Sequence, residues 1–189
     1  MPIGLYVSLL LVTAAAAVWD VRTGRVPNRL TYAAVLVGLV GWTIAGAVQG
    51  DAALAVSWAG RAWVGMLCGL VPFAVLVLTA GLGGGDMKLM AAVGAISASW
   101  EMVLAVSLYA VLVAAVMAVV VMVRRRAVRQ TLGRIAGALL MASARVKPTL
   151  PDASRTHTVP FAAAVAVGVA VAGAEQLLGW VSPWSAYGP

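Results

Sequence analysis

The sequence predicts an all-α, polytopic membrane protein of about six transmembrane helices, with its N-terminus outside. Three observations predict this class: an apolar composition, a series of long apolar runs, and basic residues concentrated on one side of the membrane. Of the 189 residues, 63% are hydrophobic and 10% are charged, and the mean hydropathy is +1.01. Soluble globular domains are about 45 to 50% apolar, so this chain needs lipid around it.

Six apolar runs are the predicted spans. A helix rises about 1.5 Å per residue, so about 17 to 25 residues cross a hydrocarbon core about 30 Å thick. In chain order the runs are 3–19, 30–48, 62–80, 89–98, 102–123 and 159–178. The run 89–98 is short, and it can cross only if the bilayer thins, its ends extend or neighbouring helices shield it. The run 3–19 is expected to remain as a span, because no basic residue precedes it as in a cleaved signal peptide.

The basic residues set the predicted orientation. Placing the N-terminus outside puts twelve of the thirteen Lys and Arg residues in cytoplasmic segments and leaves only Arg61 outside. This asymmetry follows the positive-inside rule, and it requires the short span 89–98, because every later segment inverts without it. The net charge of +7 is therefore explained by basic cytoplasmic loops next to anionic lipid. The lipid bilayer is an expected partner, and nucleic acid is not.

One long polar segment, 124–157, interrupts the apolar pattern. It contains too little apolar sequence for a packed domain, so residues 1–189 are expected to form a single membrane-embedded domain. Within it, four apolar residues recur at helical spacing and predict an amphipathic helix on the inner leaflet: Leu132, Ile135, Leu139 and Leu140. A flexible charged loop fits the same residues equally well.

Asp20 lies where the first apolar run reaches the cytoplasmic face. Gly24 and Pro27 follow it and are expected to break the helix, and Asn28 can cap the next one. Taken alone, such an aspartate is most simply a solvated residue at the membrane surface.

Asp86 lies at the same predicted face, at the end of a glycine-rich segment. Four glycines occupy positions 81 to 85 just before it, and glycine is costly in a helix, so this backbone predicts a close approach to another group. A phosphate site at this helix start is disfavoured, because the carboxylate would repel the anion. Two such aspartates on one face are stronger evidence for a site than either alone.

Two carboxyl groups sharing a proton can hydrolyse a peptide at neutral pH, one polarising the carbonyl and the other activating water. The chain has one histidine, His157, and one cysteine, Cys68, in an apolar run. These residues support neither a zinc site nor a Ser-His or Cys-His triad, and no metal or cofactor is expected. Asp20 is at a helix C-terminus and Asp86 at a helix N-terminus, so the dipoles predict a protonated Asp20 and an ionised Asp86 acting as the base.

These residues also resemble a known family. Segment 83–86, Gly-Gly-Gly-Asp, followed by Met-Lys-Leu at 87–89, resembles the second motif of the type IV prepilin peptidases, aspartyl membrane proteases with a Gly-x-Gly-Asp signature. Asp20 with Val-Pro-Asn at 26–28 resembles the first motif, and Val-Pro-Phe at 159–161 the start of the last span. Each match alone is weak, but their order and topology together are specific.

The resemblance implies an aspartic endopeptidase that cleaves pilin-like precursors after a short basic leader, at the cytoplasmic face of the bacterial inner membrane. Asp20 and Asp86 would be the catalytic pair. Gly83 and Gly85 would shape the loop that the extended leader approaches, and Lys88 would hold this loop or an acidic residue of the substrate. Pro27 and Asn28, in the first motif, would belong to the same loop and substrate region.

Within the family, the sequence is more similar to the short TadV/CpaA-like enzymes of Flp pilus systems. It lacks the cysteine-bearing cytoplasmic insert that long members carry after the first span, so neither zinc, S-adenosylmethionine nor N-methylation of the mature pilin is predicted. Archaeal preflagellin peptidases are similar too. The identity of the pilin and the oligomeric state are not specified by the sequence.

Two other classes of function remain open on the sequence. Intramembrane carboxylates often mark ion paths, so a proton- or ion-coupled carrier is one alternative, although a carrier usually places such groups near mid-membrane. The other is a non-catalytic subunit of a pilus or secretion assembly, which would tolerate the loss of either aspartate.

Overall fold

The structure, a computed structural model, describes residues 3–50, 52–80, 83–124, 133 and 160–179. Every regular element in this part of the chain is an α-helix, as predicted. The helices are α1 (Ile3–Thr23), α2 (Asn28–Val48), α3 (Ala52–Ala80), α4 (Gly84–Ser97), α5 (Trp100–Arg124) and α7 (Phe161–Leu178). The amphipathic helix predicted within 124–157 lies outside the described residues, apart from Arg124 and Gly133.

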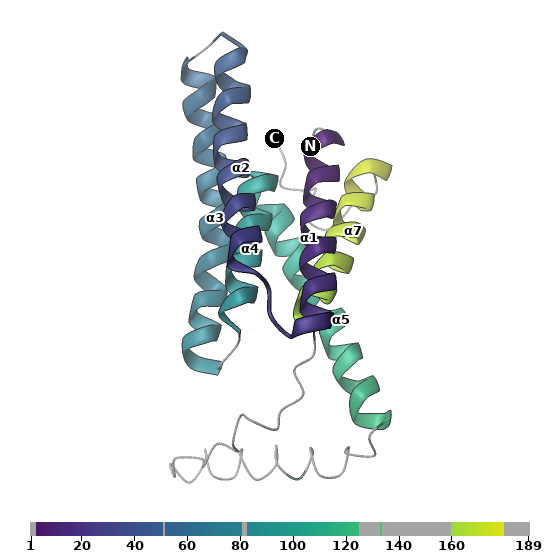
Figure 1. The fold of residues 1–189 in the computed structure, drawn as a ribbon. Helices are drawn as coiled ribbons and strands as arrows, with labels where there is room; N and C mark the ends of the chain where they lie inside the picture. Colours follow the sequence, from purple (N-terminus) through teal and green to yellow (C-terminus); the bar gives the residue numbers. More distant parts are fainter. Residues whose placement is uncertain (1–2, 51, 81–82, 125–132, 134–159, 180–189) are drawn as a thin grey trace. The chain divides into compact units, whose positions relative to one another are not determined.

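The chain divides into two compact units, Met1–Val113 with Pro160–Pro189, and Ala114–Val159. The first unit holds both aspartates of interest. Within it, α1 packs along α7, α2 packs along α3, and α4 contacts α1, α2, α3 and α7 (Figure 1). The helices of this unit run alternately up and down, so the α1–α2 link and the starts of α4 and α7 lie at the same end (Figure 1).

Five of the described helices are long and apolar enough to cross a membrane: α1, α2, α3, α5 and α7. The chain is therefore a multi-pass membrane protein. Helix α4 has 14 residues and is only about 21 Å long. Its residues 89–97 are all buried, because the neighbouring helices enclose them. The short run 89–98 is thus shielded by protein, one of the three ways in which we expected it to be accommodated.

Small residues allow this enclosure. Gly65 and Gly69 lie one turn apart on α3 and face α4, where a Cβ on Gly69 would come within 2.2 Å of the Met90 carbonyl oxygen. A Cβ on Gly94 of α4 would lie 2.0 Å from the Gly65 oxygen, and one on Gly38 of α2 would lie 2.6 Å from the Ala95 backbone. Helix α4 is therefore clamped between α2 and α3 by backbone contact, as small residues permit in membrane helices.

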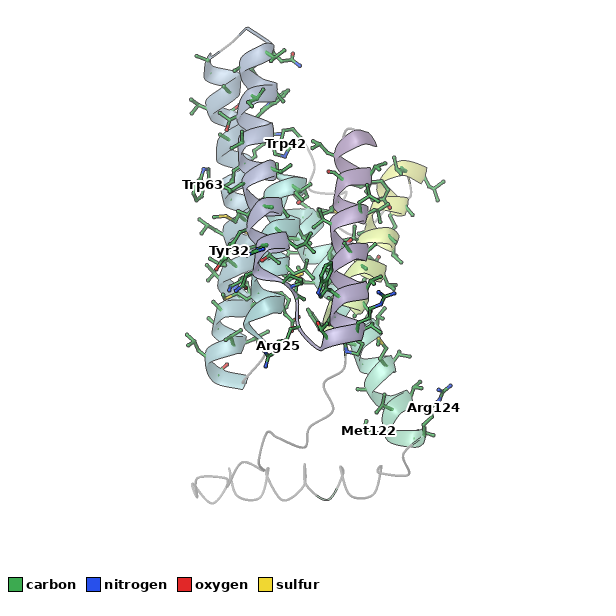
Figure 2. All side chains as sticks on the ribbon, in the orientation of Figure 1. Arg25, Tyr32, Trp42, Trp63, Met122 and Arg124 are labelled. Atoms are coloured by element: carbon green, nitrogen blue, oxygen red, sulfur yellow. The ribbon has the colours of Figure 1, made fainter. Side chains whose placement is uncertain are left out.

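Helix α3 is longer than the apolar pattern predicted. It begins at Ala52, ten residues before the predicted run 62–80, and its 29 residues extend about 43 Å. The continuous apolar run begins only after Arg61, whereas the helix includes Arg61 and the nine residues before it. Trp42 on α2 donates its indole N–H to the Ile96 carbonyl at the end of α4 (2.9 Å), while Trp63 on α3 points outward and is half exposed (Figure 2).

Polar side chains also bind α7 to its neighbours. The Tyr109 hydroxyl on α5 donates a hydrogen bond to the Glu175 carboxylate, and the Tyr6 hydroxyl on α1 donates to the Ala170 carbonyl at 3.2 Å. A Cβ on Gly168 of α7 would lie 2.8 Å from the Val106 oxygen of α5. Helix α7 is thus fixed against both α1 and α5 within the first unit, which determines where its N-terminus lies.

Candidate active site

Asp20 lies in the last turn of α1. The helix ends at Thr23, and Gly24 takes a left-handed conformation with φ +65°, so that its N–H donates to the Asp20 carbonyl at 2.7 Å. This is a common helix C-cap, for which glycine has no steric cost. Pro27 is the N-cap of α2 and ends the short link between the two helices.

The Asp20 carboxyl is buried, with 9% of its residue surface exposed, and it contacts a third helix. Its Oδ2 accepts a hydrogen bond of 3.1 Å from the backbone N–H of Ala162, in the first turn of α7. The first N–H groups of a helix have no partner within the helix, and the N-cap of α7, Pro160, has no side chain that could supply one. Asp20 therefore caps α7 from another helix.

Sequence analysis missed this contact. Pro160 before an apolar run is a recognisable sign of a helix start with free amides. The sequence offers no sign of which distant residue satisfies them, because the answer depends on how α1 packs against α7.

Asp86 lies in the first turn of α4, ahead of the apolar segment 89–98. Gly83 is the N-cap, and its oxygen accepts the Asp86 N–H at 3.1 Å. Added Cβ atoms on Gly83 and Gly85 would approach Asp86 Oδ2 and the Val26 Cβ, each to 3.3 Å, whereas Gly84 faces open space. A side chain at Gly83 would therefore crowd the Asp86 carboxyl, and one at Gly85 would crowd Val26. The absence of a side chain at Gly85 allows α4 to begin in contact with the α1–α2 link.

Lys88 joins the two motif segments. Its Nζ donates to the Asn28 side-chain oxygen at 2.8 Å and lies 5.1 Å from the centre of the Tyr32 ring. Figure 2 shows Tyr32 on α2, just beyond the link that carries Arg25. The expectation that Asn28 caps α2 is wrong: Pro27 is the N-cap, and the Asn28 side chain instead accepts the lysine. A charge-assisted hydrogen bond and a cation–π contact thus hold the start of α4 against α2.

Burial and, to a smaller extent, the negative charge of Asp20 together raise the pKa of Asp86 to about 6. The predicted effect of the α4 dipole, an Asp86 that ionises readily, is therefore wrong, because desolvation outweighs it. The effect of Asp20 on this pKa places the two carboxyl groups within electrostatic range of each other. Sequence spacing could not provide this, since 65 residues separate them.

The other candidate ligands lie elsewhere. Cys68 is a free, half-buried cysteine on α3. Among the described residues, no group of three or more His, Cys, Asp or Glu side chains is arranged to hold a metal ion. His157 and Asp152 lie outside the part that the structure describes.

A multi-pass helical membrane protein with two electrostatically coupled aspartates at one end of its bundle has the arrangement of a membrane-embedded acid–base site. Comparison with known protein families gives a match over residues 7–120 to the type IV leader peptidase family. The match covers both Asp20 and Asp86, and the chain belongs to this family of proteases. Neither the curated proteins nor the solved structures include a significant match.

Proposed function

We propose that this protein is an aspartic endopeptidase that removes the leader peptide of type IV, Flp-like prepilins at the cytoplasmic face of the bacterial inner membrane. The observation that carries the proposal is the coupling of Asp20 and Asp86. Both carboxyls lie at one end of the first unit and inside the family match, and the charge of one raises the pKa of the other.

The chemistry requires one protonated and one ionised carboxyl. With a pKa of about 6, Asp86 keeps its proton up to about one pH unit below neutrality, whereas an ordinary aspartate loses it near pH 4. A bound substrate that excludes more water would raise this pKa further. The pair can then work near neutral pH by general acid–base catalysis.

The charges around the pair support the cytoplasmic face. Arg22, Arg25, Arg29 and Lys88 lie on or beside the elements that carry the aspartates, and such residues are retained on the cytoplasmic side. The link between α1 and α2 spans only residues 24–27 and carries part of the first motif. The short TadV/CpaA-like form and a substrate of the Flp type are proposed from the resemblance of the sequence alone.

The test is cleavage of a candidate prepilin co-expressed with the wild-type protein, Asp20→Asn or Asp86→Asn, with a mobility shift and N-terminal sequencing as the readout. Both variants should accumulate to the wild-type level and leave the precursor uncut. Glu101→Gln is the matched control, because Glu101 is at the start of α5, where its carboxylate accepts a hydrogen bond from Ser99. Full cleavage by either aspartate variant would refute the proposal and favour the carrier or the assembly subunit.

A further inference from the structure

The first turn of α7 distinguishes the two aspartates from each other. Asp20 is nearly enclosed and receives a backbone N–H from Ala162 at the N-terminus of an 18-residue helix. We propose that this contact keeps Asp20 as the ionised base of the pair, so that Asp86 carries the shared proton and the Ala162 amide is a positioning group for catalysis. This inference rests on the proposed function and assigns the opposite roles to those that the dipoles of α1 and α4 predict.

The hydrogen bond gives Asp20 what a buried carboxylate needs. An N–H at a helix N-terminus carries partial positive charge, and its donation stabilises the anion over the acid. The N–H is fixed by the α7 backbone, so it does not have to reorient when the charge appears. Asp20 lies at the C-terminus of its own helix, but the direct bond to α7 acts at much shorter range than the α1 dipole.

Asp86 has no equivalent support. Within the described part of the chain its side chain accepts no hydrogen bond, although it lies in the first turn of α4. Asp86 is half-buried, and the negative charge of an ionised Asp20 acts on it. Both effects favour the neutral acid, and the raised pKa of Asp86 agrees with them.

Other charged groups do not reverse this order. The ionisable residues on the packed elements at this end are Arg22 on α1, Arg25 on the link, Arg29 and Tyr32 on α2, and Lys88 on α4. In the described residues none of them forms an ion pair with either carboxyl, and Lys88 is bonded to Asn28. The described acid of α7, Glu175, is at the far end of that helix and accepts from Tyr109.

The assignment defines each proton movement. Asp20 takes a proton from water while the water oxygen bonds to the scissile carbonyl carbon, and Asp86 gives its proton to the carbonyl oxygen. The neutral diol then collapses: Asp20 returns its proton to the leaving nitrogen, Asp86 recovers one from a diol hydroxyl, and the C–N bond breaks. One water is consumed, an acid and an amine are released, and both carboxyls return to their starting state.

The test is a titration of the whole protein in detergent micelles, labelled with ¹³C at the aspartate carboxyl carbons. The chain has only four aspartates, and Asp20→Asn and Asp86→Asn assign the two signals of interest. We expect the Asp86 signal to titrate near pH 6 and the Asp20 carboxyl to lose its proton before Asp86 does. If Asp20 titrates at the higher pH, the assignment is wrong.

A backbone variant tests the proposed cause. Ala162→Pro removes the N–H at a position in the first helical turn, where proline is tolerated, and Ala162→Gly keeps it. The Asp20 signal, and the acidic limb of kcat/KM, should move up by about one pH unit in the proline variant only. Equal behaviour of the two variants would contradict the role of the amide, and if Ala162→Pro does not fold, the wild-type titration decides alone. Since titration needs no cleavage, a failure here is distinct from the failure of the peptidase proposal.

Discussion

At the residue scale, burial determines the chemistry of Asp86. A carboxyl whose pKa is raised in the folded state disfavours folding once the pH exceeds its unfolded value, because the folded protein must then hold a charge that water would solvate better. For Asp86 this cost begins near the ordinary aspartate pKa of 3.8 and is complete above about pH 6.

Asp86→Asn should therefore stabilise the protein at pH 7.5 and lose this advantage below about pH 4, where the carboxyl is neutral in both states. After discounting for partial exposure, we expect a gain of about 1 to 2 kcal/mol, read as a rise in Tm in detergent. A Tm difference between Asp86→Asn and wild type that does not change with pH would contradict the burial effect.

The contact between Lys88 and Asn28 provides a second residue-scale prediction. If the lysine holds the start of α4 against α2, Lys88→Met and Asn28→Ala should each reduce leader cleavage about tenfold, and the double variant should be no worse than either. Asn28→Asp retains an acceptor and should keep most activity, as should Arg29→Gln on the same turn of α2. Additive losses in the double variant would show that Lys88 acts elsewhere, for instance on an acidic residue of the substrate.

Sequence pattern could identify Asp20, Asp86 and Lys88, because helix ends and glycine clusters are local features. It could not identify Ala162, since a backbone amide has no side-chain signature. It also missed the raised pKa of Asp86, because the dipole of a residue's own helix can be predicted from sequence while burial cannot.

At the element scale, the packing of α3 against α4 depends on the absence of side chains. Gly69→Ala places a methyl group 2.2 Å from the Met90 oxygen, so the helices must separate. We expect a loss of about 1 to 3 kcal/mol in stability, measured as Tm. Gly60→Ala, on the same helix but facing open space, should be neutral or slightly stabilising. Comparable losses for both variants would show that helix propensity rather than packing sets the effect.

Length and apolarity predicted where the helices lie better than where they end. The runs for α2, α5 and α7 agree with the structure to within two residues at each end, because charged or helix-breaking residues flank them. Helix α3 extends well beyond its run, since a helix need not stop at the membrane surface. Helix α4 could be predicted as a span only from the asymmetry of the basic residues. Its apolar run is short, because the neighbouring helices and not lipid surround it.

At the scale of the whole molecule, the alternating direction of the six described helices and the positive-inside rule predict an extracytoplasmic N-terminus, with both aspartates on the inside. In a Cys68→Ala background, a thiol reagent that cannot cross membranes should label Gln49→Cys in intact cells. It should label Arg25→Cys only after the membrane is opened. The reverse pattern would place the aspartates on the outer face.

The central claim is that Asp20 and Asp86 together hydrolyse a leader peptide. Its most direct test uses the purified protein in liposomes with a synthetic prepilin segment, comparing wild type, Asp20→Asn, Asp86→Asn and Glu101→Gln at equal folded amounts. We expect cleavage by wild type and Glu101→Gln and a loss of cleavage of at least about a thousandfold in both aspartate variants. Cleavage near the wild-type rate by either aspartate variant would contradict it.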